Sequence, residues 1–242
     1  MPDKKLVIIP TYNEIENIND IISSVFSLEE NFDVLIVDDS SPDGTGSVVE
    51  ELINNSYADR LFLEVRANKD GLGRAYIHGF KWALKNGYDY IFEMDADFSH
   101  NPKDLIQLYW ACKNGADLSI GSRYCQGVNV VNWPMNRVLL SFFASKYVRL
   151  ITGLPINDST AGFVCFTSKV LKELPLDKVK LVGYGFQIEM KFRAYCKKFK
   201  IVEIPIIFTD RTKGHSKMSG AIINEAVFGV IKMKFMSLLG RL

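Results

Sequence analysis

Cysteine is scarce in this chain of 242 residues, and its spacing argues against a zinc site or a disulfide framework. The four cysteines contain no C-x-x-C pair and lie far apart, at Cys112, Cys125, Cys165 and Cys196. Free thiols that are buried or partly buried are the simpler interpretation. They fit a reducing compartment, so we expect a cytoplasmic protein.

Long apolar runs and a strong excess of charge are also missing. No window of about 18–20 uninterrupted apolar residues is present, so we predict no transmembrane helix. The N-terminus carries Asp3, Lys4 and Lys5 and then leads into a strand-like segment, without the apolar stretch of a signal peptide. The formal net charge is +1, which gives no indication of nucleic-acid binding.

What the chain does have is a regular alternation of strand-like and helix-like segments. Apolar residues make up 48% of the sequence, enough for a sizeable core. The segments with strand character are residues 5–9, 33–37, 61–65, 88–94 and 116–120. Helical spacing of apolar residues is found at residues 14–28 (with Asn13 as N-cap), at 43–53, at 71–85, and after Asn101-Pro102. This order predicts an α/β fold with a mainly parallel sheet flanked by helices.

The second half of the chain is less regular. Its expected elements are a basic, apolar helix over 135–152, a segment of unassigned structure over 159–166, a helix over 185–199, a strand over 201–207 and a C-terminal helix over 221–239.

Acidic and polar residues gather where the predicted strands end, which is the edge of a parallel sheet that binds ligands. Asp95 and Asp97 follow the fourth strand with no basic residue between them. Two such carboxylates repel each other unless a cation lies between them, and Mg²⁺ or Mn²⁺ takes carboxylate oxygens. The chain has no G-x-G-x-x-G after its first strand and no P-loop motif. We therefore predict a metal at Asp95 and Asp97 that bridges to a diphosphate.

Eight motifs in order extend this interpretation: IPTYNE, VDDSSPDGT, GLGRAYIHGF, MDADFSHNP, GSRY, STAGFVCF, GYGFQIEMKFRA and DRTKGHSKM. From about Lys5 to about Met218 the chain resembles the dolichyl- or polyprenyl-phosphate mannosyltransferases, inverting family 2 glycosyltransferases with the GT-A fold. The resemblance implies a single GT-A catalytic domain, for which we take residues 1–218. We expect residues 219–242 to form an amphipathic membrane-interface helix.

The resemblance also assigns roles to individual residues. Those implied to hold the guanosine of GDP-mannose are Pro10, Tyr12, Glu14, Val37 and Asp39. Those implied to meet the diphosphate, the metal and the sugar are Asp95, Ala96 and Asp97, with Asp95 and Asp97 as metal ligands. Those implied to meet phosphate groups are Arg123, Arg211 and Lys217, which with Asp97 form the expected catalytic set. Some prokaryotic relatives have Gln where this chain has Ser99, so a metal ligand is in doubt there.

The implied reaction moves mannose from GDP-mannose to the phosphate of a polyprenyl or dolichyl phosphate. A phosphate monoester has a second pKa of about 6 and is mostly ionised near neutral pH, so the nucleophile needs no strong base. A metal would stabilise the leaving diphosphate as a Lewis acid. Displacement from one face would invert the anomeric carbon.

Two stretches of the chain are basic and apolar at once. No acid occurs from Leu118 to Asn157, and Glu225 is the only acid from Arg211 to Leu242. Such helices suit the interface of an anionic membrane, although they would also suit packing on the core or on a partner chain. We expect peripheral attachment to the cytoplasmic face of a membrane, with a separate membrane subunit as a further candidate partner.

Three alternatives remain open from the sequence. A transferase of the same fold could use UDP-glucose or another UDP-sugar with a polyprenyl phosphate. A nucleotidyltransferase would need a glycine-rich, basic loop after the first strand, which IPTYNEIEN does not provide. A non-enzymatic scaffold subunit that binds a sugar nucleotide would have no need of the complete acidic and basic set.

Overall fold

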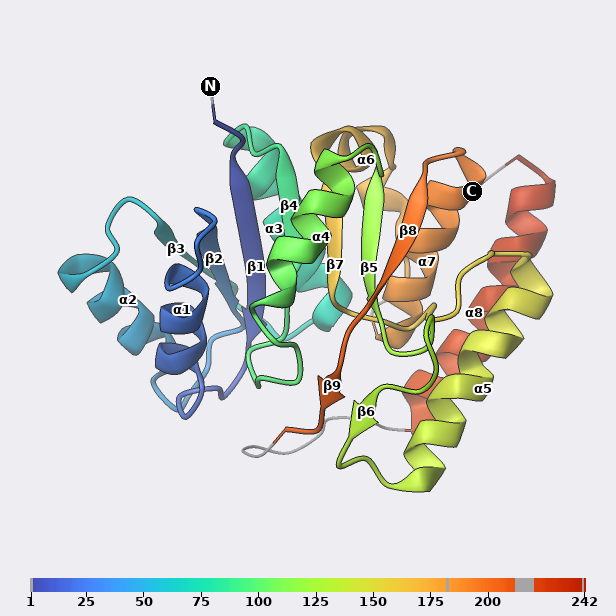
Figure 1. The fold of residues 1–242 in the computed structure, drawn as a ribbon, viewed down its shortest axis with the longest axis horizontal. Helices are drawn as coiled ribbons and strands as arrows, with labels where there is room; N and C mark the ends of the chain where they lie inside the picture. The colour runs from blue at the N-terminus through green and yellow to red at the C-terminus, as the bar shows by residue number, and fades with distance from the viewer. Residues whose placement is uncertain (1, 182, 212–219, 241) are drawn as a thin grey trace.

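A seven-stranded sheet forms the centre of the protein (Figure 1). The structure is a computed structural model, and it describes residues 2–181, 183–211, 220–240 and 242. The strands lie in the order β3-β2-β1-β4-β7-β5-β8. Their bounds are β1 Lys5–Thr11, β2 Asp33–Asp38, β3 Leu61–Val65, β4 Tyr90–Glu93, β5 Leu118–Ser122, β7 Val164–Thr167 and β8 Ile201–Pro205. A small second sheet pairs β6 Val130–Val131 with β9 Phe208–Thr209.

All neighbouring strands of the large sheet are parallel except at β7, which is antiparallel to both β4 and β5. The sequence pattern assigns no helix or strand to residues 159–166, and β7 occupies the last part of this segment. β7 has only four residues, and Val164, Cys165 and Phe166 are buried. A short strand covered on both faces shows no alternation of polar and apolar residues, so periodicity could not identify it.

Helices cover both faces of the sheet, and alternate residues of each strand face opposite layers. In β1, Leu6 and Ile8 pack with α3 Leu72–Lys85 and α7 Tyr184–Cys196, whereas Val7 and Ile9 pack with α1 Ile18–Phe26 and α4 Asp104–Lys113. The other helices are α2 Thr45–Asn55, α5 Met135–Thr152, α6 Ser168–Glu173, the 3₁₀ helix η1 Leu176–Lys178 and α8 Gly220–Leu238. The two layers explain why the strands read as continuous apolar runs.

Helices α5 and α8 lie side by side at the β8 end of the sheet (Figure 1). The Tyr147 hydroxyl donates to the Val227 carbonyl at 3.0 Å, and Lys234 Nζ donates to the Thr152 carbonyl at 3.1 Å. The second bond satisfies a carbonyl at the C-terminal end of α5, where cations are favourable. Within the described part of the chain, no helix is long and apolar enough to cross a membrane.

Most predicted elements are confirmed, with bounds that shift by a few residues. The prediction that Asn13 caps a helix from residue 14 was wrong, because α1 begins at Ile18. Asn13 instead has a φ of 57°, and the backbone N–H groups of Asn13 and Ile15 donate to Ser41 Oγ and Asp43 Oδ2. These bonds join the chain after β1 to the loop after β2, so residues 13–17 form a turn.

Candidate active site

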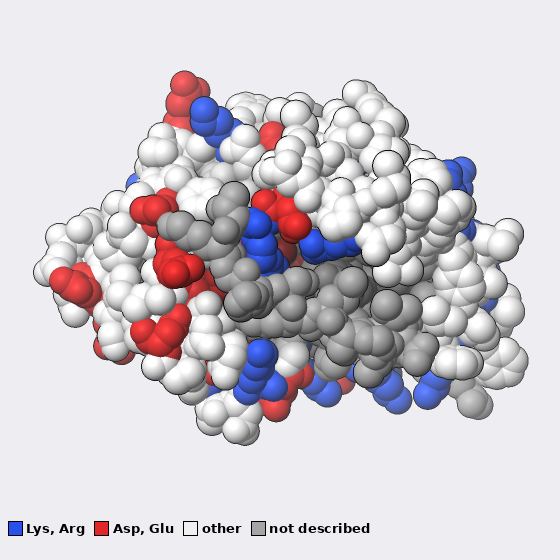
Figure 2. Space-filling view, turned by 90° about the horizontal axis from the view of Figure 1, so that it is seen from below, with Lys and Arg blue, Asp and Glu red and all other residues white. Residues whose placement is uncertain are grey.

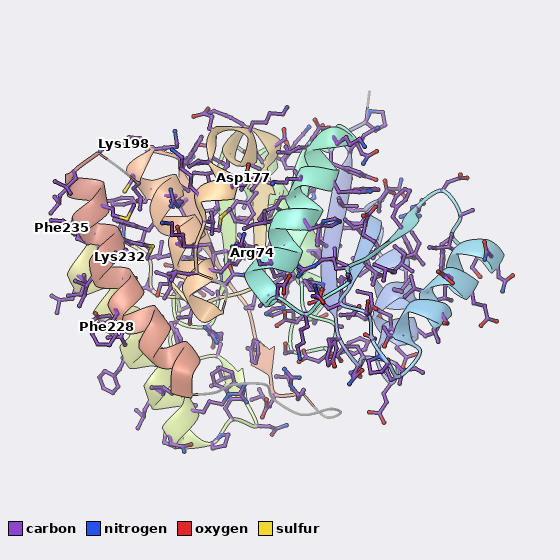
Figure 3. The ribbon with its side chains drawn as sticks, turned by 180° about the vertical axis from the view of Figure 1, so that it is seen from behind. Arg74, Asp177, Lys198, Phe228, Lys232 and Phe235 are labelled. Atoms are coloured by element: carbon purple, nitrogen blue, oxygen red, sulfur yellow. The ribbon has the colours of Figure 1, made fainter. Side chains whose placement is uncertain are left out.

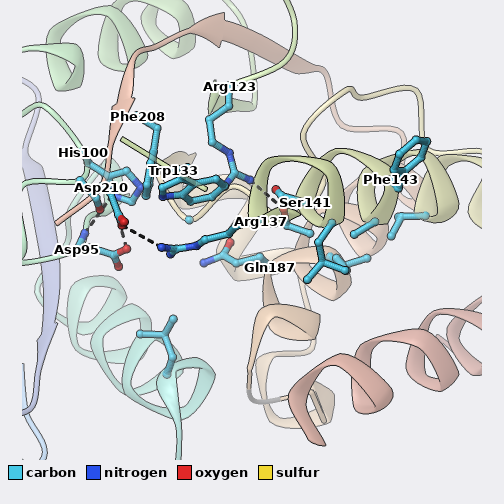
Figure 4. Close-up of a pocket in the computed structure, with 18 of the residues that line it drawn as sticks. Asp95, His100, Arg123, Trp133, Arg137, Ser141, Phe143, Gln187, Phe208 and Asp210 are labelled. Atoms are coloured by element: carbon cyan, nitrogen blue, oxygen red, sulfur yellow. Dashed lines mark hydrogen bonds and ion pairs between the residues drawn. The ribbon is translucent and has the colours of Figure 1, made fainter. Parts of the chain in front are cut away.

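One cavity opens at the carboxyl ends of the parallel strands and extends toward α5 and α8. Its volume is about 320 Å³. Acidic, basic and aromatic side chains gather in one part of it, and apolar side chains of α5 and α8 line another part (Figure 4). In the view of this edge from below, acidic side chains gather toward α1 and α2, and basic ones toward the centre and α5–α8 (Figure 2). The cavity therefore joins regions of different chemistry.

Asp95 and Asp97, which follow β4, both line this cavity, as the sequence analysis expected. Asp97 is almost buried, and its Oδ1 accepts the backbone N–H of Ser99 at 3.0 Å. Its Oδ2 lies 2.7 Å from Arg211 Nη2. Burial, reinforced by the charge of Asp97, raises the pKa of Asp95 to about 7 although Arg211 opposes the shift. A cation bound at these two carboxylates would favour their ionised forms.

The chemistry of these donors fits a metal that the substrate helps to hold. Among the described residues, no cluster of three or more histidine, cysteine, aspartate or glutamate side chains could hold a metal. Mg²⁺ commonly takes one or two protein carboxylates and completes its shell with waters and substrate phosphates. Ser99 Oγ is buried without a hydrogen-bond partner among the described residues, and it lines the cavity near the two acids.

His100 lies directly behind the two acids and shapes the loop that carries them. Its Nδ1 accepts the backbone N–H of Asp95 at 3.2 Å, and its ring stacks on Phe163 at 4.8 Å between centroids. Burial lowers the pKa of His100 to about 4. The ring is therefore neutral near pH 7, with Nδ1 as the acceptor, and it fixes the backbone of the loop without adding charge.

Arg123 enters the cavity from the loop after β5, and a buried carboxylate holds it in place. Its Nε and Nη2 donate to the two oxygens of Asp158 at 2.7 and 2.6 Å, and Nη2 also donates to Thr160 Oγ1 at 2.8 Å. Burial alone would raise the pKa of Asp158, but the Arg123 guanidinium outweighs it and holds that pKa below its ordinary value. We call Arg123, Asp158 and Thr160 the Arg123 clamp.

The segment that carries Asp158 is itself fixed by Glu203 on the edge strand β8. The two carboxylate oxygens of Glu203 accept the backbone N–H groups of Asn157 and Asp158 at 2.8 and 2.9 Å, and Ser122 Oγ donates to it at 2.8 Å. These bonds join β8 both to the Asn157–Asp158 segment and to the end of β5. The position of Arg123 is thus set by a strand that lies 80 residues away in the sequence.

Arg137 lines the cavity, although its sequence position predicts only that it belongs to the basic helix over 135–152. Its Nη1 donates to Asp210 Oδ1 at 2.9 Å, and its guanidinium lies 4.2 Å from the centre of the Trp133 ring (Figure 4). With Arg123 and Arg211, it brings three arginines to one cavity. The absence of acids on its own helix was the signal that could have suggested a partner elsewhere.

The residues expected to hold a nucleoside lie at the next strand ends along the same edge of the sheet. Pro10 and Val37 are paired in the register of β1 and β2. Lys69 Nζ lies 3.8 Å from the centre of the Tyr12 ring, and Asp39 forms an ion pair with Arg66 at 3.2 Å. Burial raises the pKa of Asp39 even with Arg66 beside it.

Three further residues were predicted for the site: Glu14, Ala96 and Lys217. Glu14 accepts a hydrogen bond from Asn17 Nδ2 at 3.0 Å in the turn after β1. Ala96 is buried between the two acids. Lys217 lies outside the described residues. The structure therefore brings Asp95, Asp97, Arg123 and Arg211 into one cavity, and places the expected nucleoside residues beside it.

Comparison with known proteins identifies the family of this chain. Residues 6–174 match the model of the Glycosyl transferase family 2 family. Among curated proteins, the polyprenol monophosphomannose synthase of Mycolicibacterium smegmatis is 47% identical over 94% of this chain and 85% of that protein. The undecaprenyl-phosphate mannosyltransferase of Micrococcus luteus is 44% identical over 94% of this chain and 92% of that protein.

Solved structures show the same fold at low sequence identity. The Staphylococcus aureus protein TarS, in complex with UDP-GlcNAc, has a TM-score of 0.65 and 19% identity and covers 98% of this chain and 66% of the TarS chain. Glucosyl-3-phosphoglycerate synthase from Mycobacterium tuberculosis, solved with Mn²⁺ and UDP, has a TM-score of 0.62 and 16% identity, and covers 99% of this chain and 80% of its own. The family model covers more than half of this chain and the relatives are similar over most of it, so this chain belongs to glycosyltransferase family 2.

Proposed function

We propose that this protein transfers mannose from GDP-mannose to the phosphate of a polyprenyl phosphate, with Mg²⁺ or Mn²⁺ as cofactor. The observation that carries the proposal is one cavity in which Asp95 and Asp97, three arginines and an apolar wall meet. Such a cavity can bind a sugar nucleotide at the acids, a phosphate at the arginines and a lipid chain at the apolar wall. The curated relatives are named for mannose and for polyprenol or undecaprenyl phosphate.

On the donor side, Asp95 and Asp97 would hold the metal, and the nucleoside would lie over the ends of β1 and β2. The bound metal would supply Lewis-acid stabilisation of the leaving diphosphate. Pro10, Tyr12 and Asp39 line the route that the guanosine would take. Arg211, which now pairs with Asp97 at 2.7 Å, is close enough to contact the diphosphate or the acceptor.

On the acceptor side, Arg123, Arg137 and Arg211 would offset the repulsion between two anionic substrates. The attacking oxygen belongs to a phosphate that is mostly ionised at neutral pH, so no side chain has to remove a proton from it. The planar guanidinium suits phosphate because it donates two parallel hydrogen bonds. Arg123 keeps a fixed orientation because Asp158 holds its Nε and Nη2. We also keep Lys217 in this set.

The lipid chain would leave the phosphate along the apolar part of the cavity. Leu140, Phe143 and Ala144 line it from α5, and Val227 and Val230 line it from α8. This wall is continuous with the arginines, so the first isoprene units would lie between the two helices while the phosphate stays at Arg123.

The outer surface of the same two helices would then rest on the membrane at its cytoplasmic face. Apolar side chains here are strongly exposed, including Leu150 at 83% on α5 and Phe228 at 72% and Phe235 at 62% on α8. Lys232 lies between the two phenylalanines on α8, and both rings point outward (Figure 3). In this proposal residues 1–218 are the catalytic domain and 219–242 the membrane-interface helix.

Replacing both Phe228 and Phe235 with serine is expected to weaken binding to vesicles by at least about tenfold. Burying one phenylalanine side chain is worth roughly 1.5–3 kcal/mol, so losing two removes a large part of the apolar attraction. Co-sedimentation with vesicles that contain anionic lipid measures the change. Trp110→Ser is the matched control, because Trp110 is an exposed aromatic residue (46%) on α4. Equal binding by the double variant and the control would contradict the membrane surface and favour a membrane subunit there.

The proposed reaction is tested by incubating the protein with radiolabelled GDP-mannose and a polyprenyl phosphate in detergent, with Mn²⁺, Mg²⁺ or EDTA. We expect a chloroform-soluble mannose product that EDTA abolishes. Transfer only from UDP-glucose, run in parallel, would overturn the donor. No lipid product from either donor, with nucleotide binding intact, would favour a scaffold role.

A further inference from the structure

The motif GYGFQIEMKFRA contributes Gln187 and Lys191 to one face of α7, and neither has a role in the proposed function so far. Gln187 is 1% exposed and lines the cavity. Its Nε2 donates to Glu93 Oε2 at 2.8 Å, and its Oε1 accepts from Lys191 Nζ at 3.3 Å. Residues four apart on a helix are neighbours, so the two side chains form one buried chain of contacts.

At one end of this chain, Glu93 is the last residue of β4, two residues before Asp95. Alternate residues of an extended segment point to the same side, so Glu93 continues the row of acids into the interior. Glu93 is fully buried, and its Oε1 has no hydrogen-bond partner in the part of the chain that the structure describes. The Gln187 amide therefore donates a hydrogen bond to the other oxygen of Glu93, Oε2, and this bond fixes the end of β4.

At the other end, Lys191 Nζ holds the segment that carries the Arg123 clamp. It donates to the carbonyl of Ala161 at 2.6 Å and to that of Ser159 at 3.3 Å. Ser159 and Ala161 lie on either side of Thr160 and follow Asp158. Thr160 and Asp158 are the two residues that bind Arg123 in the clamp. Lys191 is completely buried, so movement of the segment would deprive a buried ammonium group of two of its acceptors.

We propose that Gln187 is a positioning residue that sets the metal-binding acids at a fixed distance from the Arg123 clamp. The contacts run from β4 through Glu93, Gln187 and Lys191 to the segment of Asp158. This inference rests on the proposed function, in which the acids hold the metal and diphosphate and Arg123 holds the attacking phosphate. A misplacement of about 1 Å between two reacting groups can lower the rate about a hundredfold, so a rigid link between the two halves has direct chemical value.

The inference is tested with Gln187→Leu, which keeps the approximate size of the side chain and removes both hydrogen bonds. We expect the variant to bind Mn²⁺ about tenfold more weakly, as is typical when a group behind a metal ligand is lost. The measurement is the EPR signal of free Mn²⁺, titrated with GDP and, separately, with UDP. In the transfer assay, kcat should fall about a hundredfold, with the KM for the sugar nucleotide changed by less than about threefold if ground-state binding is kept.

Glu189→Gln provides a matched control on the same helix. Glu189 is also buried, and it pairs with Arg193 at 2.7 Å and accepts the backbone N–H groups of Lys180 and Leu181. It does not line the cavity. This variant is expected to lose thermal stability without a change in Mn²⁺ affinity. Equal Mn²⁺ affinity for Gln187→Leu and this control would overturn the inference, whatever their stability.

Two further results keep the test decisive. If Gln187→Leu does not fold, Gln187→Asn replaces it, since a shorter amide cannot reach both Glu93 and Lys191, and the same fall in Mn²⁺ affinity is expected. The Mn²⁺ titration needs neither the sugar nor the lipid. If the unaltered protein transfers no sugar but Gln187→Leu still weakens Mn²⁺ binding, the proposed reaction fails and the positioning role stands.

Discussion

Replacing Asp97 with alanine is expected to lower the rate of sugar transfer by at least about a thousandfold. A bound metal stabilises the charge of the transition state by several kcal/mol, and each 1.36 kcal/mol of that stabilisation changes the rate about tenfold. The variant loses one of the two carboxylates proposed to hold the metal. It also releases Arg211, whose Nη2 lies 2.7 Å from Asp97 Oδ2. Initial rates at saturating Mn²⁺ and donor measure the loss.

Two companion variants show whether this loss is specific. Asp97→Asn keeps the shape and the acceptor for the Ser99 N–H but removes the charge, so it should fall close to the alanine variant. Asp177→Ala removes an acid that is 83% exposed and pairs with Lys81 far from the cavity (Figure 3), and it should retain full activity. A metal site at Asp95 and Asp97 would be refuted if Asp97→Ala kept a tenth or more of the activity with the same Mn²⁺ requirement.

Replacing Asp158 with alanine is expected to lower the free energy of unfolding by about 3–5 kcal/mol, the usual cost of leaving one charge of a buried pair alone. Asp158 is completely buried, and both its oxygens bind Arg123. The freed guanidinium would also leave its fixed orientation in the cavity, so transfer should fall together with stability. Urea denaturation followed by circular dichroism measures the first effect.

Asp210→Ala gives the comparison for this prediction within the same cavity. Asp210 pairs with Arg137 at 2.9 Å, but both side chains are more than a fifth exposed. Exposed ion pairs contribute roughly 0.2–1 kcal/mol. The free energy of unfolding of this variant should therefore lie within about 1 kcal/mol of that of the unaltered protein. An equal loss of stability in both variants would contradict the claim that burial makes the Asp158–Arg123 pair contribute more to stability than the Asp210–Arg137 pair.

The sequence was sufficient for elements whose pattern is local. The helix 135–152 is α5 with the same bounds, because its start and stop are marked by Pro134 and Gly153. The start of α1 was wrong because the turn at residues 13–17 depends on Ser41 and Asp43, which lie in another loop. β7 was missed for a related reason, since its residues pair with β4 residues 71–77 positions away and with β5 residues 44–48 positions away in the sequence.

The same distinction holds in the site. Asp95, Asp97, Arg123 and Arg211 were predicted because strand ends and motifs identify them, and the structure brings them to one cavity. Asp158, Gln187 and Arg137 were not predicted as site residues. Each matters through one partner on a distant segment, and a single sequence does not say which acid meets which base. The acid-free stretch from Leu118 to Asn157 ends at Asp158, which is the partner of Arg123.

The position of β7 between β4 and β5 has a consequence for how the chain is made. β4 has β1 on one side and β7 on the other, so its second edge stays unpaired until residues 164–167 leave the ribosome. A nascent chain that ends after β5 would expose an apolar strand edge, which is a template for aggregation. Asp95 and Asp97, which follow β4, therefore acquire their final support only when most of the protein has been synthesised. Fragments cut between β5 and β7 are expected to associate with each other, or to precipitate, before they fold alone.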